Sequence, residues 1–276
     1  MGADMKGLKT RLRSVESTMH LTRAMGLVAS SKMRRSGESM QKSRAYADAF
    51  GDVMNLLSRC PACEKSPYMQ TKETGTPVLI VIAGDRGLAG GYNANVFRLT
   101  DGWLAGHPGA RVIALGRRAC DRYGAPEEGR NSSEKYTAAQ ALTLARTLCA
   151  AFLQGTVQSV TVVSTRYVSM MTQEAFTAPL LPLQKEAGAA DRRPDPEFEP
   201  GEREVLDAAV PDYVAGRIVC ALRESFACEV AARRMAMDAA DKNARAMMED
   251  LQLQYNRARQ NMITQEITEI VAGSGS

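Results

Sequence analysis

The segment best suited to chemistry is VLIVIAGDRGLAGGYNAN, residues 78–95. An apolar, β-branched run stops at Gly84, four glycines fall within eight residues, and a helix-forming stretch follows. Many phosphate-binding loops have this order of features, because a helix N-terminus offers free N–H groups to an anion. Asp85 and Arg86 lie side by side in the loop. The segment therefore raises the question of whether the chain is a nucleotide enzyme.

The glycine spacing fits neither common phosphate-binding motif. A P-loop needs G-x-x-x-x-G-K-[ST], so that a lysine reaches the phosphates and a hydroxyl reaches magnesium. No lysine follows either glycine pair, and glycines at 84, 87, 90 and 91 do not form the dinucleotide pattern G-x-G-x-x-G. The sequence favours a tight strand-to-helix turn, in which glycines supply positive φ and close backbone approach, over a phosphate site.

Other catalytic or metal-binding groups are scarce. His20 and His107 are the only histidines, which leaves little room for a Ser-His-Asp or Cys-His set. Cys60 and Cys63 form a lone C-x-x-C, whereas a structural zinc site needs four ligands. We therefore expect no catalytic residue, no cofactor and no metal ion. The sequence gives no function for the connector that carries Cys60 and Cys63.

Composition restricts the class of protein. The chain has 276 residues, a net charge of +4, 5% aromatic residues and 15 methionines, which suits long helices. No apolar run reaches the ~18 residues of a membrane-spanning helix. The N-terminal residues MGADMKGLKTRLRS lack the apolar core of a signal peptide, so we do not expect secretion.

Two long helices are predicted at the ends of the chain. Residues 5–57 contain no proline, and apolar or small residues recur there in steps of three and four, as in a coiled coil. Gly26, Ala29 and Ser30 make part of this stripe small enough for a close partner. A second proline-free stretch runs from near Pro211 to residue 271. Each helix is too long for the core of a compact domain, so we expect the two to pair antiparallel. The stripe residues are Leu8, Leu12, Val15, Met19, Thr22, Gly26, Ala29 and Met33 in the first helix, and Phe226, Val230, Met237, Ala240, Ala244, Met247, Leu251, Tyr255, Ala258, Met262, Ile263, Ile267 and Ile270 in the second.

The middle of the chain alternates strand-like and helix-like segments, which predicts a Rossmann-like α/β domain with a largely parallel sheet. PVLIVIAG, ARVIALG and VQSVTVVSTRYVSM are the expected strands, and GYNANVFRLTDGWL and TAAQALTLARTLCAAFLQG are the expected helices. The polar segment 185–202 is expected to be a loop with one edge strand at most. The predicted fold class is α+α/β, a long antiparallel coiled coil with an inserted α/β domain. Its expected parts are an N-terminal helix (1–57), a connector (58–76), the α/β domain (77–210) and a C-terminal helix (211–276).

Three stretches carry a resemblance to a known family. They are LTRAMGLVASSKMRRS (21–36), AGDRGLAGGYNANV (83–96) and EDLQLQYNRARQNMITQEITEIV (249–271). In this order they resemble the gamma subunit of F-type ATP synthase over nearly the whole chain. The resemblance implies a rotor shaft inside a ring of alpha and beta subunits. It also implies that the α/β domain is a foot that stands, with the epsilon subunit, on the membrane c-ring. Such a subunit is not itself catalytic, and it lies peripherally at the cytoplasmic face of the bacterial inner membrane.

The resemblance also implies contact residues. Met25 matches a methionine that faces a beta subunit, although it is equally well explained as a seam residue between the helices. Arg86 and Arg233 match family arginines near the stator, Gln260, Thr264 and Glu266 match polar residues that meet the alpha and beta ring, and Glu199 matches a foot residue near the c-ring and epsilon.

Two other classes compete with this interpretation. Between Lys6 and Arg35 eight basic residues stand against one acid, Glu16, so a coiled-coil adaptor could bind nucleic acid or anionic lipid through this helix. No aromatic residues interleave with these charges, and the α/β domain carries no nucleic-acid motif. A nucleotide enzyme comes third, because it depends on the glycine loop alone.

Overall fold

The structure is a computed structural model that describes residues 2–125, 131–184 and 198–274. It divides into two compact units. The helix-pair unit consists of Met1–Ser31 and Arg233–Ser276, and the α/β unit is Lys32–Ala232. The two longest helices, α1 (Gly2–Arg59) and α5 (Glu202–Ser274), each contribute residues to both units. The units therefore cut both helices, whereas the boundaries expected from sequence follow the helix ends.

The α/β unit is built on a four-stranded sheet of order β2-β1-β3-β4. Its strands are β1 (Thr76–Ile82), β2 (Arg111–Leu115), β3 (Val157–Tyr167) and β4 (Gln173–Leu181). Parallel pairing joins β1 to β2 and to β3, with Val78 opposite both Arg111 and Val160. The largely parallel, Rossmann-like sheet is thus confirmed for three strands.

The antiparallel edge strand β4 was not expected from the sequence. It pairs with β3, with Phe176 opposite Ser164. Its sequence, QEAFTAPLL, contains a proline and lacks a run of β-branched residues, which hides it from a pattern search. Pro179 is tolerated because an edge strand needs ladder hydrogen bonds on one side only. The edge strand sought in 185–202 falls mainly on residues 185–197, which lie outside the described residues.

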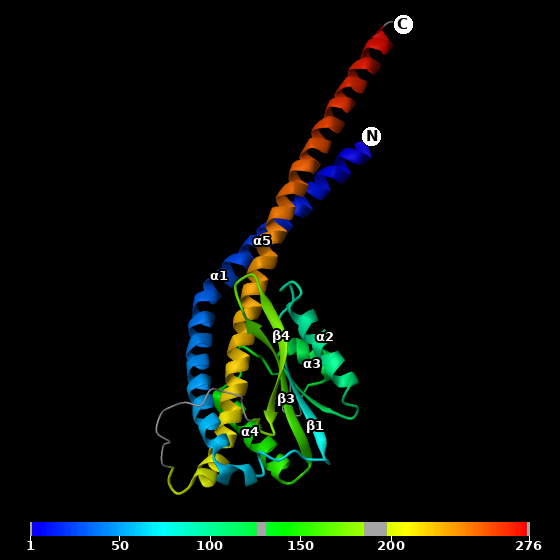
Figure 1. Cartoon of the computed structure of the whole chain (residues 1–276). Coiled ribbons are helices and arrows are strands. Elements are labelled where there is room, and N and C mark those ends of the chain that lie inside the picture. Colours follow the sequence, from blue (N-terminus) through cyan, green and yellow to red (C-terminus); the bar gives the residue numbers. More distant parts are fainter. Residues whose placement is uncertain (1, 126–130, 185–197, 275–276) are drawn as a thin grey trace. The chain divides into compact units, whose positions relative to one another are not determined.

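Helices cover both faces of the sheet (Figure 1). Alternate residues of β1 point to opposite faces, as a strand requires. Val78, Ile80 and Ile82 join a core with α4 (Ala138–Leu153) and with the parts of α1 and α5 in this unit. Leu79 and Val81 join a core with α2 (Tyr92–Ala105) and α3 (Arg117–Tyr123). The expected helices α2 and α4 are confirmed, and α3 is an additional short helix.

Part of each long helix packs in the core of the α/β unit, residues 32–59 of α1 and 202–232 of α5. This corrects the expectation that neither helix could be a core helix of a compact domain. Leu57 of α1 and Ile218 of α5 are fully buried against the sheet. The helix α5 begins at Glu202 rather than near Pro211, and Pro211 lies inside it. A proline there removes one backbone hydrogen bond. Burial of Leu206, Val210 and Val214 on either side holds the helix together despite that loss.

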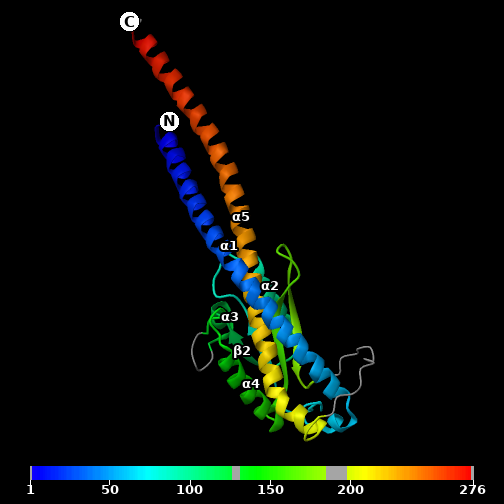
Figure 2. The same ribbon diagram turned by 90° about the vertical axis from the view of Figure 1, so that its left-hand side faces the viewer.

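The helix-pair unit is an antiparallel pair of helices, as Figure 2 shows. Arg23 Nε donates to Asp241 Oδ1 at 2.8 Å, and a Cβ added to Gly26 would lie 3.5 Å from the Met237 Cβ. From one contact to the next, the residue number rises in α1 and falls in α5, so the two helices run in opposite directions. The predicted seam is confirmed at Thr22, Gly26 and Ala29, which are buried. Ser30 is exposed and takes no part in it.

The pairing ends before α5 does. Leu251 is buried and Met262 is half-buried, but every described side chain after Met262 is exposed. In Figures 1 and 2 the C-terminal end of α5 extends past the N-terminal end of α1 within this unit. Ile263, Ile267 and Ile270 are therefore wrongly included in the predicted seam. The seam also uses Met248 rather than Met247, which is 55% exposed.

The seam register can be tested by disulfide formation. The 3.5 Å separation between an added Gly26 Cβ and the Met237 Cβ lies in the range of natural disulfides. We expect the double variant Gly26→Cys/Met237→Cys to oxidise within one chain, as measured by peptide mapping after mild oxidation. The pair Ala29→Cys/Ala244→Cys is the control, because this register separates those positions by about ten residues, or roughly 15 Å. A disulfide in the control pair and not in the first would contradict the register.

Candidate functional site

The glycine loop at the end of β1 is a tight turn shaped by close approach of another helix. Gly84 does not need positive φ; a Cβ there would lie 2.8 Å from Glu229 Cδ, so a side chain at this position would displace the Glu229 carboxylate. Positive φ occurs instead at Gly90 (56°) and at Leu88 (60°). The expectation that glycines supply positive φ is thus met at one of the four glycines.

Asp85 anchors the loop to the segment before α4. Its carboxylate accepts hydrogen bonds from the Ser132 hydroxyl at 2.6 Å and from the backbone N–H groups of Ser133, Glu134 and Arg117 at 2.9, 3.1 and 3.1 Å. Burial alone raises the pKa of Asp85, but these hydrogen bonds outweigh it and hold the pKa below its ordinary value. Asp85 is therefore a structural anchor in the charged form.

Side chains of α5 accept hydrogen bonds from backbone N–H groups at the carboxyl ends of two parallel strands. The Glu229 carboxylate accepts from Asp85 N and Arg86 N, after β1, at 3.3 Å each. Ser225 Oγ accepts from Thr165 N of β3 at 3.1 Å. Glu224 Oε1 accepts from Tyr167 N, the last residue of β3, at 2.7 Å and also from Arg44 of α1. The helix thus satisfies polar groups that the sheet leaves without a strand partner.

This arrangement decides between a turn and a phosphate site. In open α/β sheets, ligands bind outside the carboxyl ends of the parallel strands, where the strand order reverses. Here that place is taken by Glu229, which is 2% exposed, and by Ser225, which is 1% exposed. A phosphate would need the same N–H groups that the Glu229 carboxylate already occupies. The geometry therefore supports the turn.

The same contacts present Arg86 to solvent. Its backbone N–H donates to Glu229, and its carbonyl accepts from Asn93 Nδ2 at 3.2 Å. Asn93 Oδ1 in turn accepts from Gly84 N at 3.0 Å. Both sides of the Arg86 peptide are held while its side chain is exposed. Such a loop can offer the guanidinium at a fixed point.

The structure places the other sequence-predicted residues in two different units. Glu199, at the approach to α5 in the α/β unit, is exposed. In the helix-pair unit Met25 and Arg233 are half-buried, and Met25 flanks the buried seam residues Thr22 and Gly26. Both alternatives for Met25, seam or contact, remain open on this geometry.

Gln260, Thr264 and Glu266 lie on the exposed part of α5. Gln260 and Thr264 are one helical turn apart and share a face, whereas Glu266 points to another side of the helix. These three residues therefore do not form one cluster.

Sequence reasoning missed Glu224, Ser225 and Glu229, which organise the loop. A signal was present in the segment ESFACEVAA, where two acids interrupt an apolar stretch. Acids are rarely buried without partners, so acids among core residues indicate a buried polar contact. Their partners are backbone groups of distant strands, which a sequence does not display.

Metal and thiol chemistry find little support among the described residues. No group of three or more His, Cys, Asp or Glu side chains could hold a metal ion there. Cys60 precedes the short 3₁₀ helix η1 (Pro61–Lys65), and Cys63 within it is buried. Burial, followed by nearby negative groups, raises the pKa of the Cys63 thiol to about 11, which disfavours the reactive thiolate. In the same residues, no helix is long and apolar enough to cross a membrane.

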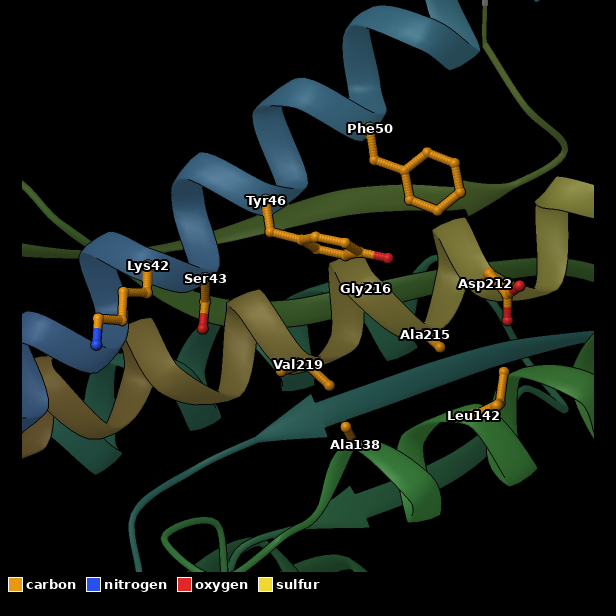
Figure 3. Close-up of a pocket in the computed structure, with 10 residues that line it drawn as sticks. All are labelled: Lys42, Ser43, Tyr46, Phe50, Ala138, Leu142, Asp212, Ala215, Gly216 and Val219. Atoms are coloured by element: carbon orange, nitrogen blue, oxygen red, sulfur yellow. The ribbon is translucent and has the colours of Figure 1, made fainter.

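A groove of about 480 Å³ lies between α1, α4 and α5 in the α/β unit (Figure 3). The Tyr46 ring lies over Gly216, where an added Cβ would come within 2.9 Å of the ring. Lys42 and Asp212 are its only charged lining residues, so the groove lacks a set of groups for acid–base chemistry. Its lining residues are Lys42, Ser43, Tyr46, Phe50, Ala138, Leu142, Asp212, Ala215, Gly216 and Val219.

The anchoring role of Asp85 predicts a pH-dependent loss of stability on mutation. Because its folded-state pKa is lowered, the carboxylate stabilises the fold above about pH 4, and that stabilisation is lost as the pH falls. Asp85→Asn should lower the free energy of unfolding by about 2–4 kcal/mol at pH 7, because an amide cannot accept the same four hydrogen bonds. Denaturant titrations at pH 7 and pH 3 measure the difference.

The matched control is Asp52→Asn on the exposed side of α1. It should change stability by less than about 0.5 kcal/mol at both pH values. The interpretation of Asp85 fails if its variant matches the control, or if the deficit is as large at pH 3 as at pH 7.

Comparisons with known proteins agree with this geometry. The family model described as ATP synthase matches residues 4–276. The ATP synthase gamma chain of Ruminococcus albus is 39% identical, with 99% of this chain and 98% of the relative covered. The gamma chains of Moorella thermoacetica and Heliobacterium modesticaldum are 39% and 35% identical, with the same coverage.

Solved structures show the same fold. The Euglena gracilis mitochondrial ATP synthase rotor covers 95% of this chain and 100% of its own, with a TM-score of 0.63 at 16% identity. The central stalk and c-ring structure from Tetrahymena thermophila covers 80% of this chain and 99% of its own, with a TM-score of 0.60 at 21% identity. Fold and loop geometry together define a protein of two long terminal helices with an α/β domain between them in the sequence. The chain belongs to the gamma chains of ATP synthase.

Proposed function

We propose that the chain is the central rotor shaft of an ATP synthase. It couples ion flow through a membrane c-ring to conformational cycling of the catalytic sites. The observation that carries the proposal is the match to gamma chains over nearly the whole length. The antiparallel helix pair suits the role, because two paired helices resist bending and twisting better than one. No finding favours the alternative of an adaptor for nucleic acid or lipid.

The partners follow from this role. The helix-pair unit and the Arg86 loop of the α/β unit meet alpha and beta subunits, and the rest of the α/β unit meets the epsilon subunit and the c-ring. Glu199, exposed near the start of α5, belongs to the second contact. The chain then lies at the cytoplasmic face of a bacterial inner membrane, held there only through the complex.

The shaft itself performs no catalysis. What supports this is the occupation of the loop N–H groups by Glu229 and the shortage of catalytic groups around the loop. The purified full chain should therefore neither hydrolyse ATP nor bind it tightly, as measured by phosphate release and equilibrium dialysis. Turnover that disappears in Gly87→Ala, or in Asp85→Asn under conditions where that variant is folded, would restore the enzyme interpretation.

The unpaired end of α5 supports a contact with the stator. Ile263, Ile267 and Ile270 are 42%, 56% and 70% exposed, beyond the end of α1. A lone helix in water gains no packing energy, so such a segment is stabilised by a partner along its length. Gln260, Thr264 and Glu266 lie in the same segment and are proposed contact residues.

Arg86, Met25 and Arg233 complete the proposed rotor–stator contacts. Arg86 is the most testable of the three, because its backbone is held and its side chain is exposed. A guanidinium can bind a carboxylate through two parallel hydrogen bonds. An exposed contact of this kind contributes on the order of 1 kcal/mol, and less at high salt. It would therefore adjust rotation without holding the complex together.

Substitution of Arg86 tests that contact. In the assembled complex Arg86→Ala should alter the ATP hydrolysis rate or its coupling to ion transport, more at low salt than at high salt. Arg86→Lys should restore only part of the effect, because an ammonium lacks the planar fork. Arg146→Ala, at an exposed position on α4, is the matched control. Wild-type rate and coupling in Arg86→Ala would reduce the loop to a turn without a contact role.

A further inference from the structure

The backbone of the Arg86 loop forms a small binding site for an anion. Two successive N–H groups, those of Asp85 and Arg86, point at the same carboxylate. Each donates to a different oxygen of Glu229, Oε2 and Oε1, at 3.3 Å. Successive N–H groups that converge in this way form a concavity that attracts negative charge. The ligand of this site is a side chain of the same molecule.

Gly84 defines the space that the anion occupies. A Cβ at this position would lie 2.8 Å from Glu229 Cδ and 3.1 Å from Glu229 Oε1. The methyl group of an alanine would therefore press against the carboxylate and displace it. Absence of a side chain at Gly84 and burial of Glu229 are thus two parts of one fit.

We propose that the Arg86 loop is an oxyanion site that the chain fills with its own Glu229, and that Glu229 is the positioning residue for Arg86. The carboxylate takes the place that a phosphate group takes in doubly wound domains, at the carboxyl end of β1. Occupation by a residue of α5 fastens the loop to that helix. Movement of this part of α5 then moves Arg86 with it. Only this last step depends on the proposed rotor function.

Removal of the side chain should uncover the site. In Glu229→Ala two partly buried N–H groups lose their acceptor, so the midpoint of thermal unfolding of the full chain should fall by about 5–15 °C. Inorganic phosphate supplies oxygens of the same kind and binds the folded state only. Saturating phosphate should recover on the order of half of the loss, with a hyperbolic dependence on concentration. Sodium chloride at equal ionic strength is the reference for each measurement.

Two further variants separate anion binding from general stabilisation. Glu229→Gln keeps the side-chain volume but presents one acceptor oxygen, so it should show a smaller loss that phosphate does not change. The double variant Glu229→Ala/Gly84→Ala fills the vacated space with a methyl group. It should respond to phosphate no more than the wild type does. Glu249→Ala, at an exposed position on α5, should match the wild type in every condition.

The outcomes decide the proposal. A saturable phosphate response in Glu229→Ala alone supports it. A variant as stable as the wild type, or a loss that phosphate and chloride change equally, overturns it. If Glu229→Ala does not fold in buffer, refolding yield with and without phosphate gives the same decision, and an equal yield overturns the proposal.

The positioning role is tested in the assembled complex without added phosphate. Glu229→Ala should change hydrolysis and coupling as Arg86→Ala does. The double variant Glu229→Ala/Arg86→Ala should be no worse than Arg86→Ala alone. Additive effects would overturn the positioning role. If neither single variant affects the complex while the phosphate response holds, the Arg86 contact proposed above is wrong and the oxyanion site stands.

Discussion

The interaction on which the α/β unit depends is the bonding of one helix to the carboxyl ends of the strands. A parallel sheet leaves backbone N–H groups there without partners, and most domains of this type satisfy them with solvent or a ligand. Glu224, Ser225 and Glu229 of α5 supply the acceptors instead. Because these groups are buried, loss of any of them leaves a donor without an acceptor, which is more costly than loss of an exposed hydrogen bond.

This constraint explains why one helix serves two units. Residues 202–232 of α5 must lie against the sheet, because Leu206, Ile218 and Leu222 fill its core. The seam residues Met237, Ala244 and Leu251 follow in the same helix and pair with α1. The helix α5 is continuous from Glu202 to Ser274, so no loop separates the stretch that packs on the sheet from the stretch that forms the seam.

The seam was predictable from sequence because a helical period of three and four is a local property. Thr22, Gly26 and Ala29 follow it, and they are buried. The choice between Met247 and Met248 was not predictable, because both lie close to the stripe and only the partner helix decides. Ile263 and Ile267 continue the period but are exposed in the described structure, so a pattern alone overestimates the pairing. The strand β4 and the acceptors Glu224 and Glu229 were not predicted from the sequence, because their roles depend on residues far away in the chain.

The ion pair between Arg23 and Asp241 joins residues separated by 218 positions in the chain. During synthesis the first thirty or so residues of α1 leave the ribosome long before their partner is made. Over that interval the seam residues Thr22, Gly26 and Ala29, which are buried in the folded chain, lack the helix that covers them. A contact of such long sequence separation forms late, after the α/β unit between its two halves can fold. The helix-pair unit is therefore completed last during synthesis, because its second half is Arg233–Ser276.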